Sequence, residues 1–254
     1  MITRVNLLLQ LPENAVFRQN IAYSLYGMLC DRMDPVMAEA FHTQAITPIR
    51  QHVEFEGGRI FRWTVDLFGE AEVLATLLQN QTDFKLESFS EPLAVLECTI
   101  LDMPDISSLL AVCHTWPEEP SSFQIIFKTP CTFKVAGTYA QFPSVAWIAQ
   151  SLFQRWNALI PDGAMDDPDA LHLLTAGLEI RRYRLMSRDY WLKGQRISGF
   201  TGSVLLSARL PAPMMQLLKL LLAFAPYSGI GIKTTLGMGA VDVIPCVRHP
   251  FKVG

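Results

Sequence analysis

The segment "FAPYSGIGIKTTLGMGAVDV", residues 224–243, joins an apolar run to a strand-like end and decides how the last part of the chain folds. Four of the chain's 15 glycines fall within eleven residues of it. They are Gly229, Gly231, Gly237 and Gly239, and they surround Lys233. Glycine allows positive φ angles and close approach of the backbone to other groups. The segment is therefore predicted to be a glycine-rich connection from a helix to a final strand.

Two common phosphate-binding loops do not match this connection. A Walker loop needs glycine directly before Lys-Ser/Thr, whereas Ile232 precedes Lys233 here. A dinucleotide-binding loop follows a strand and opens a helix, but this one follows "MMQLLKLLLAFA" (214–225) and precedes "GAVDVIP" (239–245). Two interpretations stay open from the glycines alone: a tight turn, or a cradle that binds an anion through backbone N–H groups.

The pattern around this connection gives the order of elements in the second half of the chain. "SSFQIIFKTPCTFKV" (121–135) alternates like a strand, and "VAWIAQSLFQRWNAL" (145–159) has helical spacing. The helix is expected to bury Ile148, Leu152, Trp156 and Leu159. Arginine-rich strands between 178 and 210, the helix over 213–225 and the last strand complete a β-α-β-β-α-β unit.

The first half repeats this order. Strands are predicted over 3–11, 59–68 and 93–101, with room for another between 45 and 53. Helices are predicted over 15–31, after Pro35 and over 70–80. The predicted fold class is α+β, with tandem ferredoxin-like (RRM-like) domains. The expected boundary is residues 1–117 and 118–254, because "TWPEEPSS" (115–122) reads as a linker.

Composition narrows the class of protein. Half of the 254 residues are apolar and 18% are charged, yet no apolar run approaches the roughly 18 residues that cross a bilayer. The opening "MITRVNLLLQ" lacks the cleavage site of a signal peptide. The five cysteines form no C-x-x-C pair, which suits a reducing compartment and argues against structural zinc. A cytoplasmic protein without membrane contact is expected.

Charge is distributed unevenly along the chain. The formal net charge is −3, but residues 181–209 contain seven basic residues and only one acidic residue, Asp189. These residues are Arg181, Arg182, Arg184, Arg188, Lys193, Arg196 and Arg209. Either a solvated hairpin or a local polyanion-binding surface would account for the cluster.

Four stretches together resemble a known family. They are "YSGIGIKTTLGMGAV", "ISGFTGSVLLS", "LFQRWNAL" after "IIFKTPCTFKV", and "FHTQAITPIR". Together they are similar to the CRISPR repeat-processing endoribonucleases, the sixth-numbered Cas family of the RAMP superfamily. The resemblance covers nearly the whole chain and implies two ferredoxin-like domains, in agreement with the tandem pattern.

The resemblance implies a metal-independent endoribonuclease that cleaves CRISPR precursor transcripts within the repeat to give guide RNAs. A ribose 2′-hydroxyl would attack the neighbouring phosphate and leave a 2′,3′-cyclic phosphate and a 5′-hydroxyl. No cofactor or metal is expected. The implied partners are the repeat RNA and a CRISPR effector complex, and either a monomer or a homodimer is compatible with the sequence.

Proton transfer in such a reaction suits histidine, whose ordinary pKa lies near neutral. The resemblance assigns this role to His42, which ends the first helical region in "AFHTQAITPIR". His52 is the reserve candidate. The other three fall in the expected linker, acidic loop and tail, and they are His114, His172 and His249.

Two further catalytic candidates follow from the resemblance. Tyr26 would orient His42 or contact the ribose, although a core tyrosine with its hydroxyl at the rim fits equally well. The family tends to have a lysine several residues after the histidine, and here no lysine occurs between Asp31 and Phe84. Arg50 is the nearest substitute, and because arginine does not act as a general acid, the identity of the acid stays open.

The resemblance also implies that the glycine-rich segment and the basic strands bind RNA. The glycines would expose their amides and bring Lys233 to the RNA backbone in the cleft between domains. The expected RNA-binding residues are Gly229, Gly231, Lys233, Thr234, Thr235, Gly237 and Gly239 with Arg181, Arg182, Arg184, Arg188, Lys193 and Arg196.

Two alternative functions stay open. One is a non-catalytic RAMP-type subunit that holds RNA in a CRISPR effector complex. The other is a tandem ferredoxin-like domain that binds a small molecule or a protein, for which the negative net charge is the supporting observation.

Overall fold

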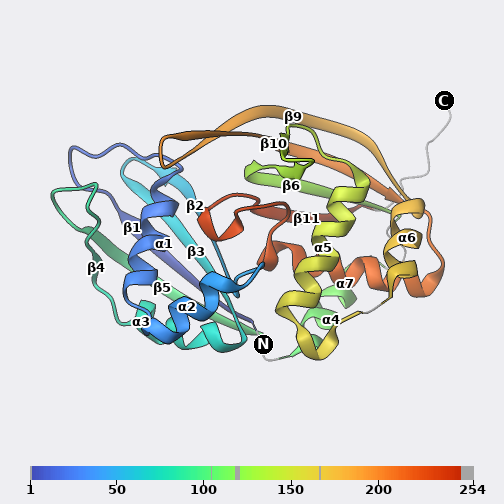
Figure 1. Cartoon of the computed structure of the whole chain (residues 1–254), viewed down its shortest axis with the longest axis horizontal. Helices are drawn as coiled ribbons and strands as arrows, with labels where there is room; N and C mark the ends of the chain where they lie inside the picture. The colour runs from blue at the N-terminus through green and yellow to red at the C-terminus, as the bar shows by residue number, and fades with distance from the viewer. Residues whose placement is uncertain (1, 104, 118–120, 166, 247–254) are drawn as a thin grey trace.

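The computed structural model describes residues 2–103, 105–117, 121–165 and 167–246. Two antiparallel sheets lie side by side, one in each half of the chain, and helices pack against both (Figure 1). No helix in these described ranges is long and apolar enough to cross a membrane. The tandem pattern predicted from the sequence is thus present in the structure.

The first sheet has the strand order β2-β3-β1-β5-β4. Its four main strands follow the ferredoxin-like order, with the first strand in the middle beside the third and the fourth. The strands are β1 (Ile2–Gln10), β2 (Ile49–Gly57), β3 (Ile60–Phe68), β4 (Asp83–Phe84) and β5 (Leu93–Met103). The helices of this half are α1 (Ile21–Asp31), α2 (Pro35–Thr43) and α3 (Val73–Gln79), with a 3₁₀ turn, η1 (Gly69–Glu72), before α3.

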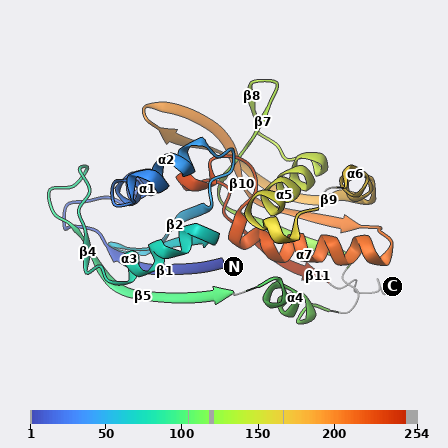
Figure 2. The same cartoon turned by 60° about the horizontal axis from the view of Figure 1, so that its bottom comes forward.

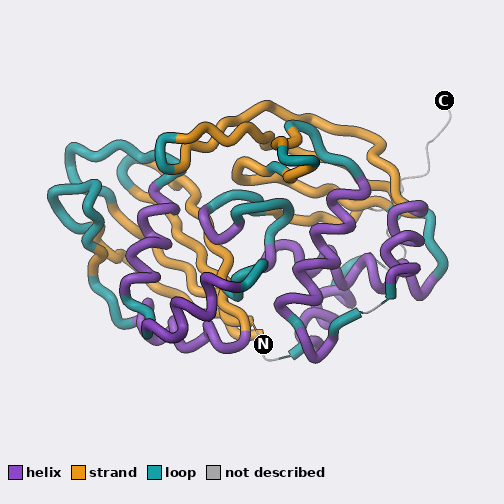
Figure 3. The backbone as a smooth tube through the Cα atoms, in the orientation of Figure 1, coloured by secondary structure: helices purple, strands orange, loops and turns teal. Residues whose placement is uncertain are grey.

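The second sheet repeats the layout with the order β11-β6-β10-β9. Figure 3 shows the strands of both halves in orange and the helices that pack on them in purple. A small two-stranded hairpin is not part of this second sheet and projects from the second half in Figure 2. The strands are β6 (Ser122–Cys131), β7 (Phe133–Val135), β8 (Thr138–Ala140), β9 (Leu178–Leu192), β10 (Gln195–Ala208) and β11 (Val241–Cys246). The helical elements are α5 (Val145–Leu159), η2 (Pro161–Gly163), α6 (Pro168–Gly177), α7 (Ala212–Ser228) and η3 (Thr234–Leu236).

Each sheet buries alternate side chains under its helices. In β1 the buried residues include Val5, Leu7 and Leu9, and in β6 they include Phe123 and Ile125. This alternation is the period of two that identified the strands. The helix α5 buries Ile148, Leu152, Trp156 and Leu159, as its spacing predicted. Two main apolar cores result, and the core of the second half also takes in Ile2, Phe68 and Met103 from the ends of three strands of the first sheet.

Two helices were missed by the sequence pattern. Residues 106–114, for which the sequence pattern predicts no element, form α4 (Ile106–His114), which packs against α7 of the second half (Figure 2). Asp105 accepts a hydrogen bond from Ser108 N and so caps this helix. The region read as an acidic loop contains α6, in which Asp167 is the N-cap, so His172 lies on a helix. In both places the acids are caps rather than loop residues.

The hairpin of β9 and β10 reaches from the second half to the first. Its turn consists of two residues, Lys193 and Gly194, with φ angles of 49° and 75°. Positive φ at both positions is the geometry that matches the twist of a tight hairpin. The ammonium group of Lys193 lies 5.7 Å from the ring centre of Tyr23 on α1. The tip of the hairpin therefore contacts α1 across the junction of the two halves, as Figure 1 shows.

The glycine-rich segment runs between the two halves, and each of its four glycines has a positive φ. A Cβ at Gly239 would lie 2.1 Å from the carbonyl oxygen of Ile230. A Cβ at Gly237 would lie 2.5 Å from the Cβ of Ala22 on α1. Glycine is therefore required here by tight packing of the segment on itself and on the first half.

Substitution of Gly239 by alanine is expected to lower the free energy of unfolding by more than about 1 kcal/mol, because it adds a steric clash to an unfavourable φ. Gly58 is the matched control, because its φ of 57° is similar but nothing lies within 4 Å of its Cβ position. Chemical denaturation of both alanine variants separates the two effects. Equal losses would show that the close packing at Gly239 contributes nothing.

Candidate functional site

A groove of about 900 Å³ lies where the two halves meet. Three segments line it: the turn that follows α2, one face of α5, and the glycine-rich segment. The lining residues are Gln44, Ala45, Ile46, Thr47, Ser151, Gln154, Arg155, Asn157, Ala158, Gly231, Ile232, Lys233, Thr234 and Thr235. Amides, hydroxyls and two cationic side chains dominate this surface, and no carboxylate is among the lining residues of the described chain.

His42 lies in the last turn of α2, two residues before the groove lining begins. Its side chain is exposed, while the neighbouring Phe41 is buried and anchors the helix. His42 lines a smaller cavity of about 400 Å³ together with Tyr26 and Cys30 of α1. The imidazole is thus accessible to a ligand, and Tyr26 shares its cavity.

Tyr26 is only partly exposed. Burial, together with its interaction with Cys30, raises the pKa of the phenol above its ordinary value. The hydroxyl therefore stays protonated at neutral pH and can donate a hydrogen bond. It is poorly suited to accept a proton as a base.

The amides of the glycine-rich segment are used inside the protein. Gly229 N donates to Ala225 O at 2.8 Å, and Gly239 N donates to Pro130 O at 2.9 Å. Gly231 N donates to Ser151 Oγ at 2.9 Å. The expectation that these three glycines expose their amides is therefore wrong, because a helix carbonyl, a strand-end carbonyl and a helix hydroxyl already accept hydrogen bonds from them. Of the two interpretations of the glycines, the structure favours the tight turn.

Arg155 of α5 holds this turn in place. Its guanidinium donates to Ser228 O at 3.0 Å, to Thr234 Oγ1 at 2.9 Å and to the carbonyl oxygen of Gly231. The side chain is buried and makes no ion pair with any described carboxylate. Burial, with the charge of Arg50, lowers the pKa of Arg155 to about 10, so it stays charged at neutral pH.

Lys233 is the cation that the turn presents to the groove. Its backbone has a φ of 58°, which is unusual for a residue with a side chain. Leu236 N and Met238 N both donate to the Lys233 carbonyl, so the conformation is fixed by the turn. The side chain is partly exposed and lines the groove. Thr235 lies beside it and is also partly exposed, whereas Thr234 is buried against Arg155.

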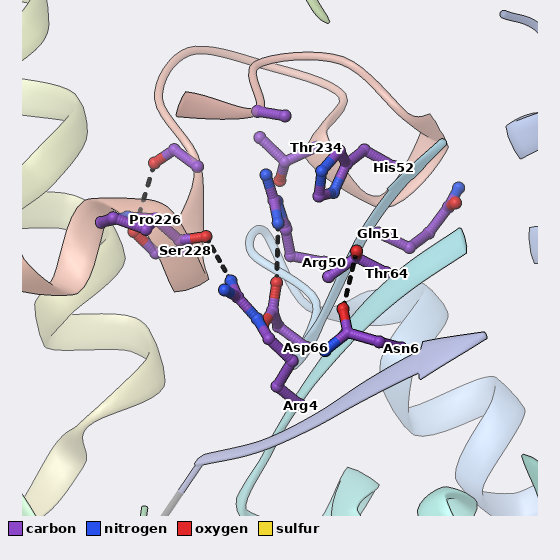
Figure 4. Close-up of polar contacts among 12 residues, drawn as sticks. Arg4, Asn6, Arg50, Gln51, His52, Thr64, Asp66, Pro226, Ser228 and Thr234 are labelled. Atoms are coloured by element: carbon purple, nitrogen blue, oxygen red, sulfur yellow. Dashed lines mark hydrogen bonds and ion pairs between the residues drawn. The ribbon is translucent and has the colours of Figure 1, made fainter. Parts of the chain in front are cut away.

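Arg50 does not reach the groove. Its side chain is buried at the junction of the two halves, where the guanidinium lies 2.7 Å from Asp66 Oδ2 and the side chain is only 2% exposed (Figure 4). Arg4 contacts the other oxygen of Asp66 at 2.6 Å and also donates to the carbonyl oxygen of Pro226 in the last turn of α7. The expected catalytic role of Arg50 is therefore not supported, because the strand direction of β2 points its side chain at the junction.

Gln51 forms a second connection between the halves. Its side-chain amide donates to Ala22 O on α1 at 2.9 Å and to Thr235 O at 2.8 Å. Trp63 Nε1 donates to the amide oxygen of Gln51. Because Gln51 is fully buried, all of these bonds are made away from water. The glycine-rich segment is thereby fixed against β2 and α1 as well as against α5.

His52, the reserve candidate, is buried rather than accessible. Its Nε2 lies 2.9 Å from Glu54 Oε1, which is also 2.7 Å from Lys128 Nζ of β6. Burial, aided by the charge of Arg50, lowers the pKa of His52 to about 3. Although burial alone would raise the pKa of Glu54, its bonds to His52 and Lys128 lower it to about 2. His52 therefore belongs to a structural contact between the halves.

The basic residues of β9 and β10 are exposed, but they do not form one row. Arg182, Arg184 and Arg188 alternate on one face of β9. Arg196 of β10 pairs with Trp191 of β9, so it lies on the opposite face of the hairpin. That face also carries Phe200, which belongs to the core of the second half. The basic residues therefore divide between the two faces of the hairpin, and their binding to RNA stays a prediction.

Arg181 follows a local irregularity in the pairing of the two strands and contacts Glu179 at 3.4 Å. Lys193 lies at the hairpin tip against α1. Among the residues expected to bind RNA, Gly231, Lys233, Thr234 and Thr235 line the groove that begins two residues after His42. The β9 arginines are not among its lining residues in the described chain.

The pKa values of His52 and Glu54 predict how the stability of the folded protein depends on pH. The unfolded chain binds a proton at His52 near pH 6.5, whereas the folded protein does not until about pH 3. The free energy of unfolding should therefore fall as the pH drops below 6.5, and Glu54 adds to this loss only below about pH 4.5.

Replacement of His52 by glutamine should flatten the stability profile between pH 6.5 and 4.5, as measured by denaturant unfolding at each pH. His114→Gln is the control, since His114 is exposed at the end of α4. Parallel profiles for the wild type and His52→Gln would show that His52 is not buried in its neutral form.

Comparison with known proteins gives this arrangement a family. Residues 125–241 match the family model described as CRISPR-associated endoribonuclease Cas6. A Cas6 endoribonuclease from Streptococcus thermophilus is 31% identical over 240 residues, which cover 89% of this chain and 92% of that protein. A Cas6 from Mycobacterium tuberculosis is 27% identical over 236 residues, covering 89% of this chain and 74% of that protein.

Solved structures agree on the fold. A Cas6 product complex superposes with a TM-score of 0.78 at 21% identity, covering 96% of this chain and all of the other. Thermus thermophilus Cas6 gives a TM-score of 0.72 at 22% identity, covering 96% of this chain and 98% of that one. The ferredoxin-like halves and the order of elements are thus shared over the full length. On the strength of the 31% identity over nearly the whole of both chains, this protein belongs to the CRISPR-associated endoribonuclease Cas6 family.

Proposed function

We propose that the protein cleaves CRISPR precursor transcripts within the repeat, with the scissile phosphate at the rim of the groove beside His42. The observation that carries the proposal is the exposed imidazole of His42, two residues before the groove that Lys233 and Arg155 line. An imidazole can exchange protons near neutral pH, and the nearby cations can stabilise an anionic transition state.

In the proposed reaction the ribose 2′-oxygen forms a bond to the adjacent phosphorus, and the bond from phosphorus to the 5′-oxygen breaks. One proton leaves the 2′-hydroxyl, and one is delivered to the departing 5′-oxygen. The products are a 2′,3′-cyclic phosphate and a 5′-hydroxyl. His42 transfers a proton in this scheme, while Tyr26 donates a hydrogen bond from the same cavity.

Lys233 replaces Arg50 as the proposed phosphate-binding cation. The segment 228–240 is packed and internally bonded, so the lysine is held in position before RNA binds. Such preorganisation is the main source of electrostatic stabilisation of a charged transition state. No metal or cofactor takes part in the proposed mechanism.

The partner implied by this activity is the repeat RNA, in the cytoplasm where the transcript is made. Positive charge at the junction supports RNA as the ligand: Arg4 and Arg50 share the single carboxylate of Asp66, and Arg155 has no carboxylate partner in the described chain.

We also propose that the two domains comprise residues 1–117 and 118–254, although α4 of the first range packs on the second domain. Binding to an effector complex, and the choice between monomer and homodimer, also stay proposals.

Replacement of His42 by alanine should reduce the cleavage rate of repeat RNA by about 10²- to 10⁴-fold, the usual contribution of a positioned proton-transfer group, with little change in RNA affinity. His114→Ala is the matched control, because that histidine is also exposed in the last turn of a helix. Cleavage assays in EDTA should give the same ratio. Full activity of the His42 variant would remove His42 from the mechanism.

Replacement of Lys233 by alanine should weaken RNA binding and reduce the slope of log K against log salt concentration by about 0.7, the value for one phosphate contact on a single strand. Arg184→Ala provides the comparison, since Arg184 lies on the other face of β9. Filter binding over a range of salt concentrations measures both. A larger effect at Arg184 than at Lys233 would place the RNA on the outer face of the second sheet instead of in the groove.

A further inference from the structure

The solvent-facing side of α1 has an unusual composition. The helix buries Ile21, Ala22, Leu25, Met28 and Leu29 against the first sheet. Its other side carries Tyr23, Tyr26, Gly27 and Cys30, with no charged residue before Asp31. The outer side of a surface helix normally carries charged and polar residues. Within the described chain, Tyr26 and Cys30 pack beside α2 and the tip of the β9–β10 hairpin lies on Tyr23, so both ends of this side are partly covered. Its middle, at Gly27, is open.

Gly27 lies in the middle of this outer side and has no packing role within the molecule. Nothing except the helix itself lies within 4 Å of a Cβ placed there. Glycine is among the worst residues for a helix interior. The other reason to place glycine at such a position is to let another backbone approach closely. Within the described chain, nothing approaches Gly27 this closely.

Proton-transfer and cationic groups stand at the two ends of this side. At one end, Lys193 Nζ of the β9–β10 hairpin lies 5.7 Å from the ring centre of Tyr23. At the other end, Tyr26 and Cys30 share a cavity with His42. Glu39 also lines that cavity, from α2, and is its one acidic residue. A ligand lying along α1 would therefore contact an ammonium group, an aromatic ring and the catalytic imidazole in turn.

We propose that this outer side of α1 binds one unpaired nucleotide of the RNA next to the cleavage position. Its base stacks on Tyr23, its phosphate contacts Lys193, and its sugar–phosphate backbone crosses the helix at Gly27. Base stacking on aromatic side chains is the usual way in which single-stranded RNA is bound. The flanking lysine favours a nucleic acid over an apolar protein surface as the occupant. The proposal rests on the proposed function and names a subsite of it.

The test uses four variants of the full-length protein: Gly27→Leu, Tyr23→Ala, Tyr23→Phe and Ser24→Ala. Binding of a non-cleavable repeat RNA is measured by fluorescence anisotropy, cleavage of the natural repeat by gel assay, and thermal unfolding by circular dichroism. Gly27→Leu should leave the unfolding midpoint unchanged or higher, since leucine favours a helix and the site is open. The same variant should weaken RNA binding about tenfold or more.

Tyr23→Ala should also weaken binding about tenfold, which corresponds to the loss of one stacked base. Tyr23→Phe and Ser24→Ala should bind like the wild type, because they keep the ring or lie beside the subsite. Normal RNA binding by both Gly27→Leu and Tyr23→Ala, in folded protein that cleaves the repeat, would overturn this subsite alone. A wild-type protein that fails to cleave the repeat would instead overturn the proposed function.

Discussion

The buried guanidinium of Arg155 is the interaction on which the rest of the site depends. It binds the end of α7 through Ser228, the middle of the glycine-rich segment through Gly231, and the start of η3 through Thr234. Hydrogen bonds from a charged donor are stronger than neutral ones, and burial increases their effect. Gln51 binds the other side of the turn, so the segment is fixed between the two halves as a rigid wedge. The groove and the position of Lys233 both follow from that wedge.

This arrangement separates two tasks that the glycines could have combined. Their amides and their positive φ angles are used to build a tight turn, so the turn itself offers few free donors. The charge that a phosphate needs comes instead from side chains that the turn positions, chiefly Lys233. The first half supplies the exposed His42 on α2, which packs through Phe41. Neither half alone would carry a complete site.

The sequence predicted the fold well because both halves carry clear periodicity. The main strands and helices were predicted, although the helix predicted over 15–31 begins only at Ile21, and the short strands β4 and β8 were missed. The helices α4 and α6 were missed as well, because aspartates like those that cap them are also common in loops. The site was predicted less completely. The family resemblance pointed to His42, whose role stays a prediction, whereas Arg155 and Gln51 were not singled out, since a polar residue on a mostly apolar element gives no sign of its distant partners. Arg50 was misplaced because only the register of β2 decides that its side chain points inward.

Amide hydrogen exchange of the RNA-free protein tests the central claim most directly. If the glycine-rich segment is an internally bonded wedge, the amides of Gly229, Gly231 and Gly239 should exchange slowly without RNA, at rates like those of the neighbouring core, and change little when repeat RNA is added. Fast exchange of these amides in the free protein, with protection that arises only when RNA binds, would contradict the account. The glycines would then form an anion-binding loop whose N–H groups are hydrogen-bonded only when an RNA phosphate is present.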